Sequence, residues 1–368
     1  MKKVAIITLN NYLNYGNRLQ NYALQNFLKN LNTNIYLETV WYEKLKLKLA
    51  EKLTRYVNIR DFIFNKNGFR EFINSGKYIY GIIREYNFKK FNDKYINSVF
   101  DYKIKDDLND RYDYFIVGSD QIWNPNYSDL KNEFLQFADR NKRVAYAASF
   151  GVSEIPDDKV EIVKKGLEGI DCISVREQVG AKIVKDLTGR DVPVLVDPTL
   201  LLTVEEWEKV MERPVWYRDE KYILVYFLSK LPDKIKKDIQ NLAEKYKLKI
   251  VDLMDKENID YYCSPPSEFL YLIKNCSLIY TDSFHGTVFS ILNKIPFVTC
   301  SREGGINMDS RIDTLLSMFN LQSRKISKEN NYEIANPMEI EYPDVEAILN
   351  RERQRSKEFL CKALNIKE

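Results

Sequence analysis

Short apolar runs alternate with amphipathic stretches along the first half of the chain. The apolar runs have the length of β-strands and cover residues 4–9, 35–40, 114–117, 144–149, 172–175 and 192–196. The clearest amphipathic stretch spans residues 17–31, where apolar side chains recur every four residues and predict a helix. Further helices are expected over residues 158–167 and 177–187. Strands that alternate with helices are typical of a doubly wound α/β fold.

The alternation starts again after a break near Arg213 and Pro214, from which polar residues run to Lys221. Just before the break, Thr203 and Glu206 have the spacing of a capping box, which predicts a short helix. Strands then follow over residues 222–228, 249–253, 278–280 and 295–298, and helices over 233–246, 267–275, 288–292 and 311–319. Residues 344–364 predict a closing helix. We therefore expect two Rossmann-like domains, 1–213 and 214–368, facing each other across a cleft.

Composition narrows the class of protein. The 368 residues exceed the size at which a single core keeps growing, which agrees with two domains. No apolar stretch approaches the roughly 20 residues of a membrane-spanning helix, and the charged N-terminus continues as a first strand, so we expect a cytoplasmic protein. A net charge of +3 does not indicate a nucleic-acid partner. The five cysteines form no close pair and the chain has one histidine, so neither a disulfide nor a metal site is expected.

Charge is concentrated in one segment. Residues 41–100 hold 13 Lys and Arg against 6 Asp and Glu, interleaved with many aromatic residues. The simpler interpretation is a helical excursion with a solvated basic face. The alternative is a surface that contacts an anionic partner, either membrane phospholipid at the inner face of the membrane or a lipid-linked phosphorylated substrate.

The one histidine, His285, lies at a strand-to-helix junction between Asp282 and Gly286. Ligands of open α/β sheets bind at the carboxyl ends of strands, where helix N-termini point backbone N–H groups at anions. Histidine is also the side chain that titrates closest to neutral pH. A packed histidine that spaces the turn is the alternative, but its position favours a functional role in proton transfer.

Polar residues follow three other predicted strands. Arg176 should stand at the mouth of the sheet beside a helix N-terminus, where a guanidinium grips a carboxylate or phosphate; a salt bridge to Glu177 or to a neighbouring loop is the alternative. Residues 118–124 combine a glycine with side chains suited to a sugar, although the tryptophan could simply pack: Asp120, Gln121, Trp123 and Asn124. Residues 14–24 form a glycine turn that opens a helix. They lack the spacing of a dinucleotide site or P-loop, and no nucleophile elbow occurs in the chain.

Taken together, these segments resemble the polysaccharide pyruvyltransferase family. The likeness runs through residues 14–24, 118–124, 145–151, 174–177 and 282–286 to Pro296-Phe297. It implies a glycosyltransferase-B-like pair of Rossmann-like domains and a transferase that moves a pyruvyl group from phosphoenolpyruvate to two hydroxyls of a sugar, forming a ketal. The acceptor would be a cell-surface polysaccharide or its lipid-linked precursor, and the reaction needs no cofactor beyond the donor.

The resemblance also implies roles for single residues. His285 takes the general acid/base role, and Arg176 holds the phosphoenolpyruvate anion together with Ser283 and Gly286. Some members carry an arginine where this chain has Ser283, and Arg302 and Arg311 are the candidates to supply the missing cation. On the acceptor side, Asn17 and Arg18 join the four residues of segment 118–124.

Two other functions remain open from the residues alone. A nucleotide-sugar glycosyltransferase would use the same cleft between two domains, with a different donor. A sugar-binding protein without turnover would retain Arg176 and Trp123 but tolerate loss of His285.

Overall fold

The computed structural model describes residues 1–9, 13–31, 34–41, 76–100, 107–127, 130–302, 309–329 and 333–366. The first of its two sheets has the strand order β3-β2-β1-β4-β5-β6, and all neighbouring strands are parallel. These strands are β1 (Lys2–Ile7), β2 (Ile35–Trp41), β3 (Ser98–Phe100), β4 (Tyr114–Val117), β5 (Arg143–Ala148) and β6 (Cys172–Val175). The predicted parallel α/β architecture is therefore confirmed for the first half of the chain.

Helices connect these strands, as parallel pairing requires. They are α1 (Tyr15–Leu31), α4 (Gly76–Tyr95), α5 (Leu108–Arg111), α6 (Asp157–Glu168) and α7 (Gln178–Thr188), followed by the 3-10 turn η2 (Pro198–Leu200) and α8 (Val204–Glu208). The predicted capping box of α8 is present, because Thr203 and Glu206 each bond the other's backbone N–H.

One predicted strand is wrong. Residues 192–196 form no strand, and their backbone pairs with the first sheet at a single bridge between Val175 and Val194. The physical reason is Pro193, which has no N–H to donate to a ladder and so confines its segment to the sheet edge.

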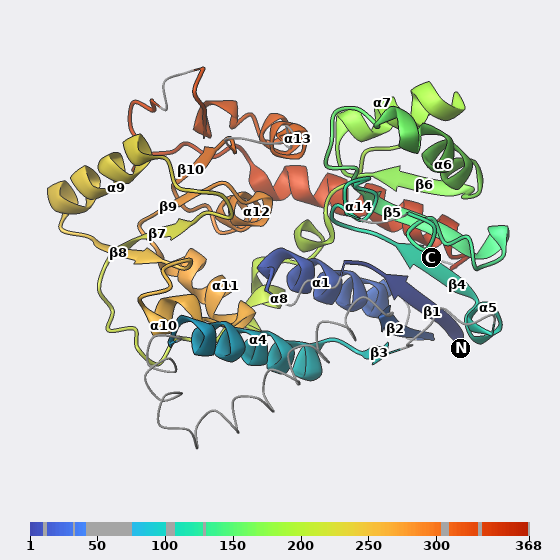
Figure 1. Cartoon of the computed structure of the whole chain (residues 1–368), viewed down its shortest axis with the longest axis horizontal. Coiled ribbons are helices and arrows are strands. Elements are labelled where there is room, and N and C mark those ends of the chain that lie inside the picture. The colour runs from blue at the N-terminus through green and yellow to red at the C-terminus, as the bar shows by residue number, and fades with distance from the viewer. Residues whose placement is uncertain are drawn as a thin grey trace, which may run out of the picture.

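The second sheet has the order β11-β10-β9-β7-β8 and is also parallel throughout. Its strands are β7 (Tyr222–Tyr226), β8 (Lys249–Asp252), β9 (Leu278–Thr281), β10 (Phe297–Cys300) and β11 (Lys325–Ile326). The helices of this half are α9 (Asp233–Tyr246), α10 (Ile259–Tyr262), α11 (Pro266–Asn275), α12 (Phe284–Leu292) and α13 (Ser310–Met318). The two sheets form the centres of a first and a second domain (Figure 1).

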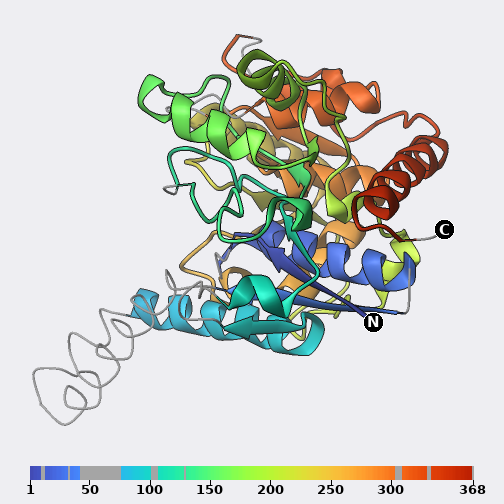
Figure 2. The ribbon, with the colours of Figure 1, turned by 90° about the vertical axis from the view of Figure 1, so that its right-hand side faces the viewer.

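The closing helix α14 (Val345–Ala363) returns from the second sheet to the first. Arg353 of α14 donates to the carbonyls of Leu200 and Leu202, at 3.0 and 2.9 Å. Figure 1 shows α14 running from the second domain to the first, and Figure 2 shows it at the edge of the molecule, close to the C-terminus. The C-terminal helix thus fastens the two domains together. The boundary at residues 213–214 falls between β6 and β7 and stays a prediction.

The domains also share a hydrophobic core. One continuous cluster contains Val4 and Ile116 of the first sheet together with Leu224 and Ile279 of the second. Helix α4 contributes to this contact, since the guanidinium of its Arg84 donates to the carbonyl of Tyr262. Because apolar packing is continuous across the junction, the relative position of the domains is defined by close-packed side chains.

Only part of the predicted basic segment 41–100 is described, since residues 42–75 lie outside the described ranges. In α4, Lys89 pairs with Asp93 and Lys94 pairs with Glu212, so some of the positive charge is compensated within the molecule. No helix of the described residues is long and apolar enough to cross a membrane.

Candidate active site

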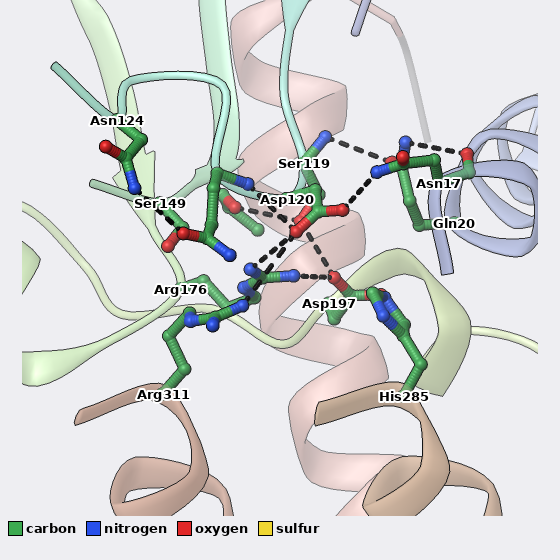
Figure 3. Close-up of polar contacts among 12 residues, drawn as sticks. Asn17, Gln20, Ser119, Asp120, Asn124, Ser149, Arg176, Asp197, His285 and Arg311 are labelled. Atoms are coloured by element: carbon green, nitrogen blue, oxygen red, sulfur yellow. Dashed lines mark hydrogen bonds and ion pairs between the residues drawn. The ribbon is translucent and has the colours of Figure 1, made fainter. Parts of the chain in front are cut away.

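Charged side chains from both domains meet at the carboxyl ends of the first sheet (Figure 3). Asp120 follows β4, Arg176 follows β6, and Asp197 lies in the turn that leads into η2. From the second domain, His285 stands on the first turn of α12 and Arg311 on the first turn of α13. All five residues are buried, so they form an enclosed ionic cluster.

Arg176 lies at the centre of this cluster. Its Nη1 donates to Oδ2 of Asp197 at 2.6 Å and its Nη2 to Oδ1 of Asp120 at 3.1 Å, while its guanidinium carbon lies 4.4 Å from the ring centre of Phe284. Only Nε lacks a hydrogen-bond partner among the described residues. The sequence predicted either a ligand anion or a salt bridge to Glu177 or to a neighbouring loop. The structure shows salt bridges to neighbouring loops, because the guanidinium holds Asp120 and Asp197.

Asp197 is a site residue that sequence reasoning missed. Its Oδ1 accepts from the amide of Thr199 at 3.0 Å and from the Thr199 hydroxyl at 2.7 Å, and its Oδ2 accepts from the Ser119 hydroxyl at 2.9 Å. Burial acts to raise the pKa of Asp197, but His285, Arg176 and the Thr199 amide outweigh it and hold this pKa well below its usual range. Asp197 is therefore an ionised carboxylate at neutral pH.

The imidazole of His285 points at this carboxylate. Its Nε2 lies 3.7 Å from Oδ1 of Asp197, which is too long for a hydrogen bond but close for an ion pair. Nε2 has no hydrogen-bond partner among the described residues, although the side chain is only 7% exposed. A buried ring nitrogen without a partner is available to a reactant, which agrees with the predicted position of His285 at the site.

A second part of the first domain, the start of α1, also borders the imidazole. A methyl group placed on Gly16, in the first turn of α1, would overlap Nδ1, Cε1 and Cγ of His285. The ring therefore packs directly on the backbone of α1. The sequence predicts a glycine turn at the start of this helix, but it gives no sign that Gly16 contacts His285.

Arg311 is the second buried cation. Its Nη1 lies 3.9 Å from Oδ1 of Asp120. With the Gln121 amide turned to suit its neighbours, the Gln121 oxygen accepts from Nη1 and Nη2 of Arg311 at 3.2 and 3.1 Å. Burial, together with the charge of Arg176, lowers the pKa of Arg311 to about 10. This lowered pKa means that the negative charge around Arg311 only partly offsets its desolvation.

Glu177, which the sequence suggested only as a salt-bridge partner of Arg176, is a further buried acid. Its Oε1 accepts from the Ser149 hydroxyl and from the amide of Phe150, both at 3.0 Å. Its Oε2 has no hydrogen-bond partner among the described residues. Burial raises the pKa of Glu177, and the charges of Arg176 and Arg311 offset this only in part.

The remaining donor-side candidates have structural partners. The Ser283 hydroxyl caps α12 by accepting from the amide of Gly286 at 3.3 Å. The Nε of Arg302 lies 3.3 Å from Oδ2 of Asp282, and the charge of Arg302 contributes to the lowered pKa of Arg311. Of the two arginines expected to replace the missing cation, Arg311 is the one that reaches the cluster.

The acceptor-side candidates divide into two groups. Asn17 donates to Asp120, and Gln121 accepts from Nδ2 of Asn124 at 2.9 Å in one of its two orientations, so these residues join the site. Arg18 is buried beside a different neighbour, because its guanidinium lies 4.9 Å from the ring centre of Trp41.

Trp123 corrects the predicted sugar contact. The indole is 0% exposed, it stacks on Phe134 with 5.1 Å between ring centres, and its Nε1 donates to the carbonyl of Glu133 at 2.8 Å. Its faces and its one polar atom are occupied by the protein, so no ring face is open to a sugar. The packing alternative raised by the sequence is the one that the structure supports.

A cavity of about 780 Å³ lies between α7 and α13, beside the cluster. Its walls include Gln178 and Ser153 of the first domain and Ser310 and Thr314 of the second, with Arg355 of α14. None of the five charged residues of the cluster lines it. We place the chemistry at the cluster because only there do a histidine, two arginines and two carboxylates meet. No group of three His, Cys, Asp or Glu side chains in the described ranges is arranged to hold a metal ion.

With this geometry established, the comparison with known families is decisive. The sequence model of the polysaccharide pyruvyl transferase family matches residues 14–304, which include every residue of the cluster except Arg311. The chain belongs to the polysaccharide pyruvyl transferase family. This membership supports an enzyme that modifies polysaccharides, and it confirms the likeness noted in the sequence.

Solved structures show what this pyruvyl transferase family member resembles in fold. The S. aureus MnaA–UDP co-structure has 12% sequence identity, covers 100% of this chain and 98% of its own, and has a TM-score of 0.50. UDP-GlcNAc 2-epimerase from Neisseria meningitidis gives 12% identity, 100% and 95% coverage and a TM-score of 0.42. E. coli ADP-heptose lps heptosyltransferase II has 10% sequence identity, covers 99% of this chain and 98% of its own, and has a TM-score of 0.38.

At these identities the likeness concerns the fold alone, and the two parallel sheets confirm the predicted glycosyltransferase-B-like pair of Rossmann-like domains. A search of curated proteins finds no match to the sequence.

Proposed function

We propose that this protein transfers the pyruvyl group of phosphoenolpyruvate to two hydroxyls of a sugar and forms a cyclic ketal. The observation that carries the proposal is the buried imidazole of His285, which lies in one cluster with two arginines and two aspartates and whose Nε2 has no hydrogen-bond partner among the described residues. Membership of the polysaccharide pyruvyl transferase family supports the reaction class. The acceptor we propose is a cell-surface polysaccharide or its lipid-linked precursor, modified on the cytoplasmic side of the membrane.

The reaction requires two proton movements. One sugar oxygen bonds to C2 of phosphoenolpyruvate while the methylene carbon C3 gains a proton. The second sugar oxygen then bonds to C2 as the bond from C2 to the phosphate oxygen breaks. The two hydroxyl protons end on the new methyl group and on the released inorganic phosphate. We assign proton transfer to Nε2 of His285, with Asp197 stabilising the imidazolium that forms.

Phosphoenolpyruvate brings a carboxylate and a phosphate, so its site needs positive charge. Arg176 is already balanced by Asp120 and Asp197. Arg311 is less well compensated, and its Nε has no hydrogen-bond partner among the described residues. An anion beside Arg311 would therefore gain a charge-assisted hydrogen bond. We propose that Arg311 supplies the cation that other members place at the position of Ser283.

Calorimetric titration of phosphoenolpyruvate into the wild type, Arg311→Gln and Arg302→Gln tests this assignment. We expect saturable binding to the wild type, at least about tenfold weaker binding to Arg311→Gln because a charge-assisted contact is lost, and a smaller change for Arg302→Gln. A panel of nucleotide sugars is titrated in parallel. Binding of a nucleotide sugar with no response to phosphoenolpyruvate would refute the proposed donor and favour a glycosyltransferase.

A further inference from the structure

We infer that Tyr15, Gly16 and Asp197 of the first domain are positioning residues for His285 of the second, so that the imidazole reaches its working geometry only across the docked domain interface. The inference rests on the proposed function, which makes His285 the proton-transfer group. The evidence lies in three contacts, which hold the start of α1, one side of the ring and the ring nitrogen Nε2.

The first contact fixes the start of α1 against the second domain. The hydroxyl of Tyr15 donates to the carbonyl of Ser264 at 2.8 Å. Its ring stacks on Phe269 of α11 with 4.2 Å between centres and 9° between planes. Tyr15 is 0% exposed, so the first turn of α1 is anchored inside the second domain although the rest of α1 follows the first sheet.

The second contact involves the residue next in the chain. Gly16 lies directly against the imidazole, and any side chain at this position would occupy the space of the ring. Because α1 begins at Tyr15, the residue that packs into the second domain (Tyr15) and the residue that contacts the imidazole (Gly16) belong to the same helical turn. A shift of that turn would displace the imidazole, since a close-packed contact transmits small movements.

The third contact places the carboxylate of Asp197 opposite Nε2, 3.7 Å away. Asp197 is held rigidly by Thr199, Ser119 and Arg176, all of the first domain. The ring is therefore bounded by Gly16 and Asp197 of one domain while its backbone belongs to the other. Figure 3 shows the imidazole beside Asp197. An error of about 1 Å in such a position costs on the order of 100-fold in rate, because the reacting atoms lose their alignment.

The chain offers a matched pair of substitutions and a direct probe. Gly16→Ala puts a methyl group into the imidazole, whereas at Gly81, also a helical glycine, the same methyl group meets nothing within 4 Å. Because His285 is the one histidine of the chain, NMR of the full-length protein with isotope-labelled histidine gives signals from this imidazole alone. These signals report ring position whether or not the substrate is known.

We expect Gly16→Ala to shift the imidazole signals and to lower kcat about 100-fold, with the KM for phosphoenolpyruvate changed less than about threefold. Gly81→Ala should retain the wild-type signals and rate. Tyr15→Phe, which removes only the hydroxyl, should shift the same signals less, and it serves as the test if Gly16→Ala does not fold. Unchanged imidazole signals in Gly16→Ala, or in Tyr15→Phe where that variant replaces it, would overturn the inference.

Failure of the proposed function would look different. A wild type that binds no phosphoenolpyruvate refutes the proposed donor, but the imidazole signals of the variants still decide whether Gly16 and Tyr15 position the ring. Conversely, normal turnover in Gly16→Ala together with wild-type imidazole signals removes the positioning role and leaves the proposed reaction intact.

Discussion

Arg176 donates to Asp197 through a buried ion pair of 2.6 Å, and the same guanidinium also holds Asp120. Loss of Arg176 would leave two carboxylates buried without their counter-ion. Breaking a buried pair in this way costs about 3–5 kcal/mol, because the charge that remains has no compensation. The arginine that the sequence singled out for donor binding thus also supports the folded site.

The first prediction concerns this stability role. Arg176→Ala should lower the free energy of unfolding by about 3–5 kcal/mol, measured by denaturant unfolding without ligand. The matched control is Arg140→Ala, which breaks the solvent-exposed pair with Asp171 and should leave the unfolding midpoint nearly unchanged. Equal midpoints for Arg176→Ala and the wild type would mean that the buried network does not stabilise the fold.

A second prediction follows from the position of Trp123. Trp123→Ala removes a fully buried indole and should cost about 3–5 kcal/mol of stability, because it leaves a cavity and an unpaired carbonyl at Glu133. The acceptor KM should stay near the wild-type value once the variant is assayed below its melting temperature. Trp123→Phe, which retains most of the ring volume, should recover part of the stability. A raised acceptor KM without loss of stability would restore the sugar-stacking hypothesis.

The third prediction is the pH dependence of stability. The folded-state pKa of Asp197 is lowered, so its contribution to stability is present above the unfolded pKa of about 3.9 and is lost as pH falls through the folded pKa. Between those two values the unfolded state binds more protons, so stability rises with pH. We expect the urea midpoint of the wild type to fall below about pH 4, and to fall less steeply in Asp197→Asn.

Glu177 should act with the opposite sign, which is the fourth prediction. Burial raises the folded pKa of Glu177 above its unfolded pKa of about 4.3, so the folded state binds more protons and stability falls as pH rises between the two values. Glu177→Gln should therefore gain stability relative to the wild type as pH increases from about 4. A midpoint difference between Glu177→Gln and the wild type that does not change with pH would contradict the raised pKa.

Much of this architecture is readable from local pattern. The alternation of apolar runs and amphipathic stretches predicted both parallel sheets, and the polar ends of three strands led to Asp120, Arg176 and His285. Each of these depends on residues close together in the sequence. Short strands such as β3, with three residues, carry too little periodicity to be recognised.

The rest depends on contacts between segments far apart. Asp197 looks like an ordinary polar residue before a proline, and only the folded chain brings it to Arg176 and His285. Likewise, Gly16 reads as a glycine at a helix start until the second domain places an imidazole on it. The residues around Trp123 in the sequence are of the kinds that bind sugars. Only its packing against Phe134 in the folded protein shows that Trp123 is a core residue.

The central claim is that His285 moves protons during pyruvyl transfer. The direct measurement follows ¹³C-labelled phosphoenolpyruvate in D₂O with acceptor glycans, for the wild type and for His285→Asn. We predict a deuterated methyl ketal and equimolar phosphate with the wild type, and a rate about 10²- to 10⁴-fold lower with His285→Asn at similar donor affinity. Ketal formation at the wild-type rate by His285→Asn would contradict the account.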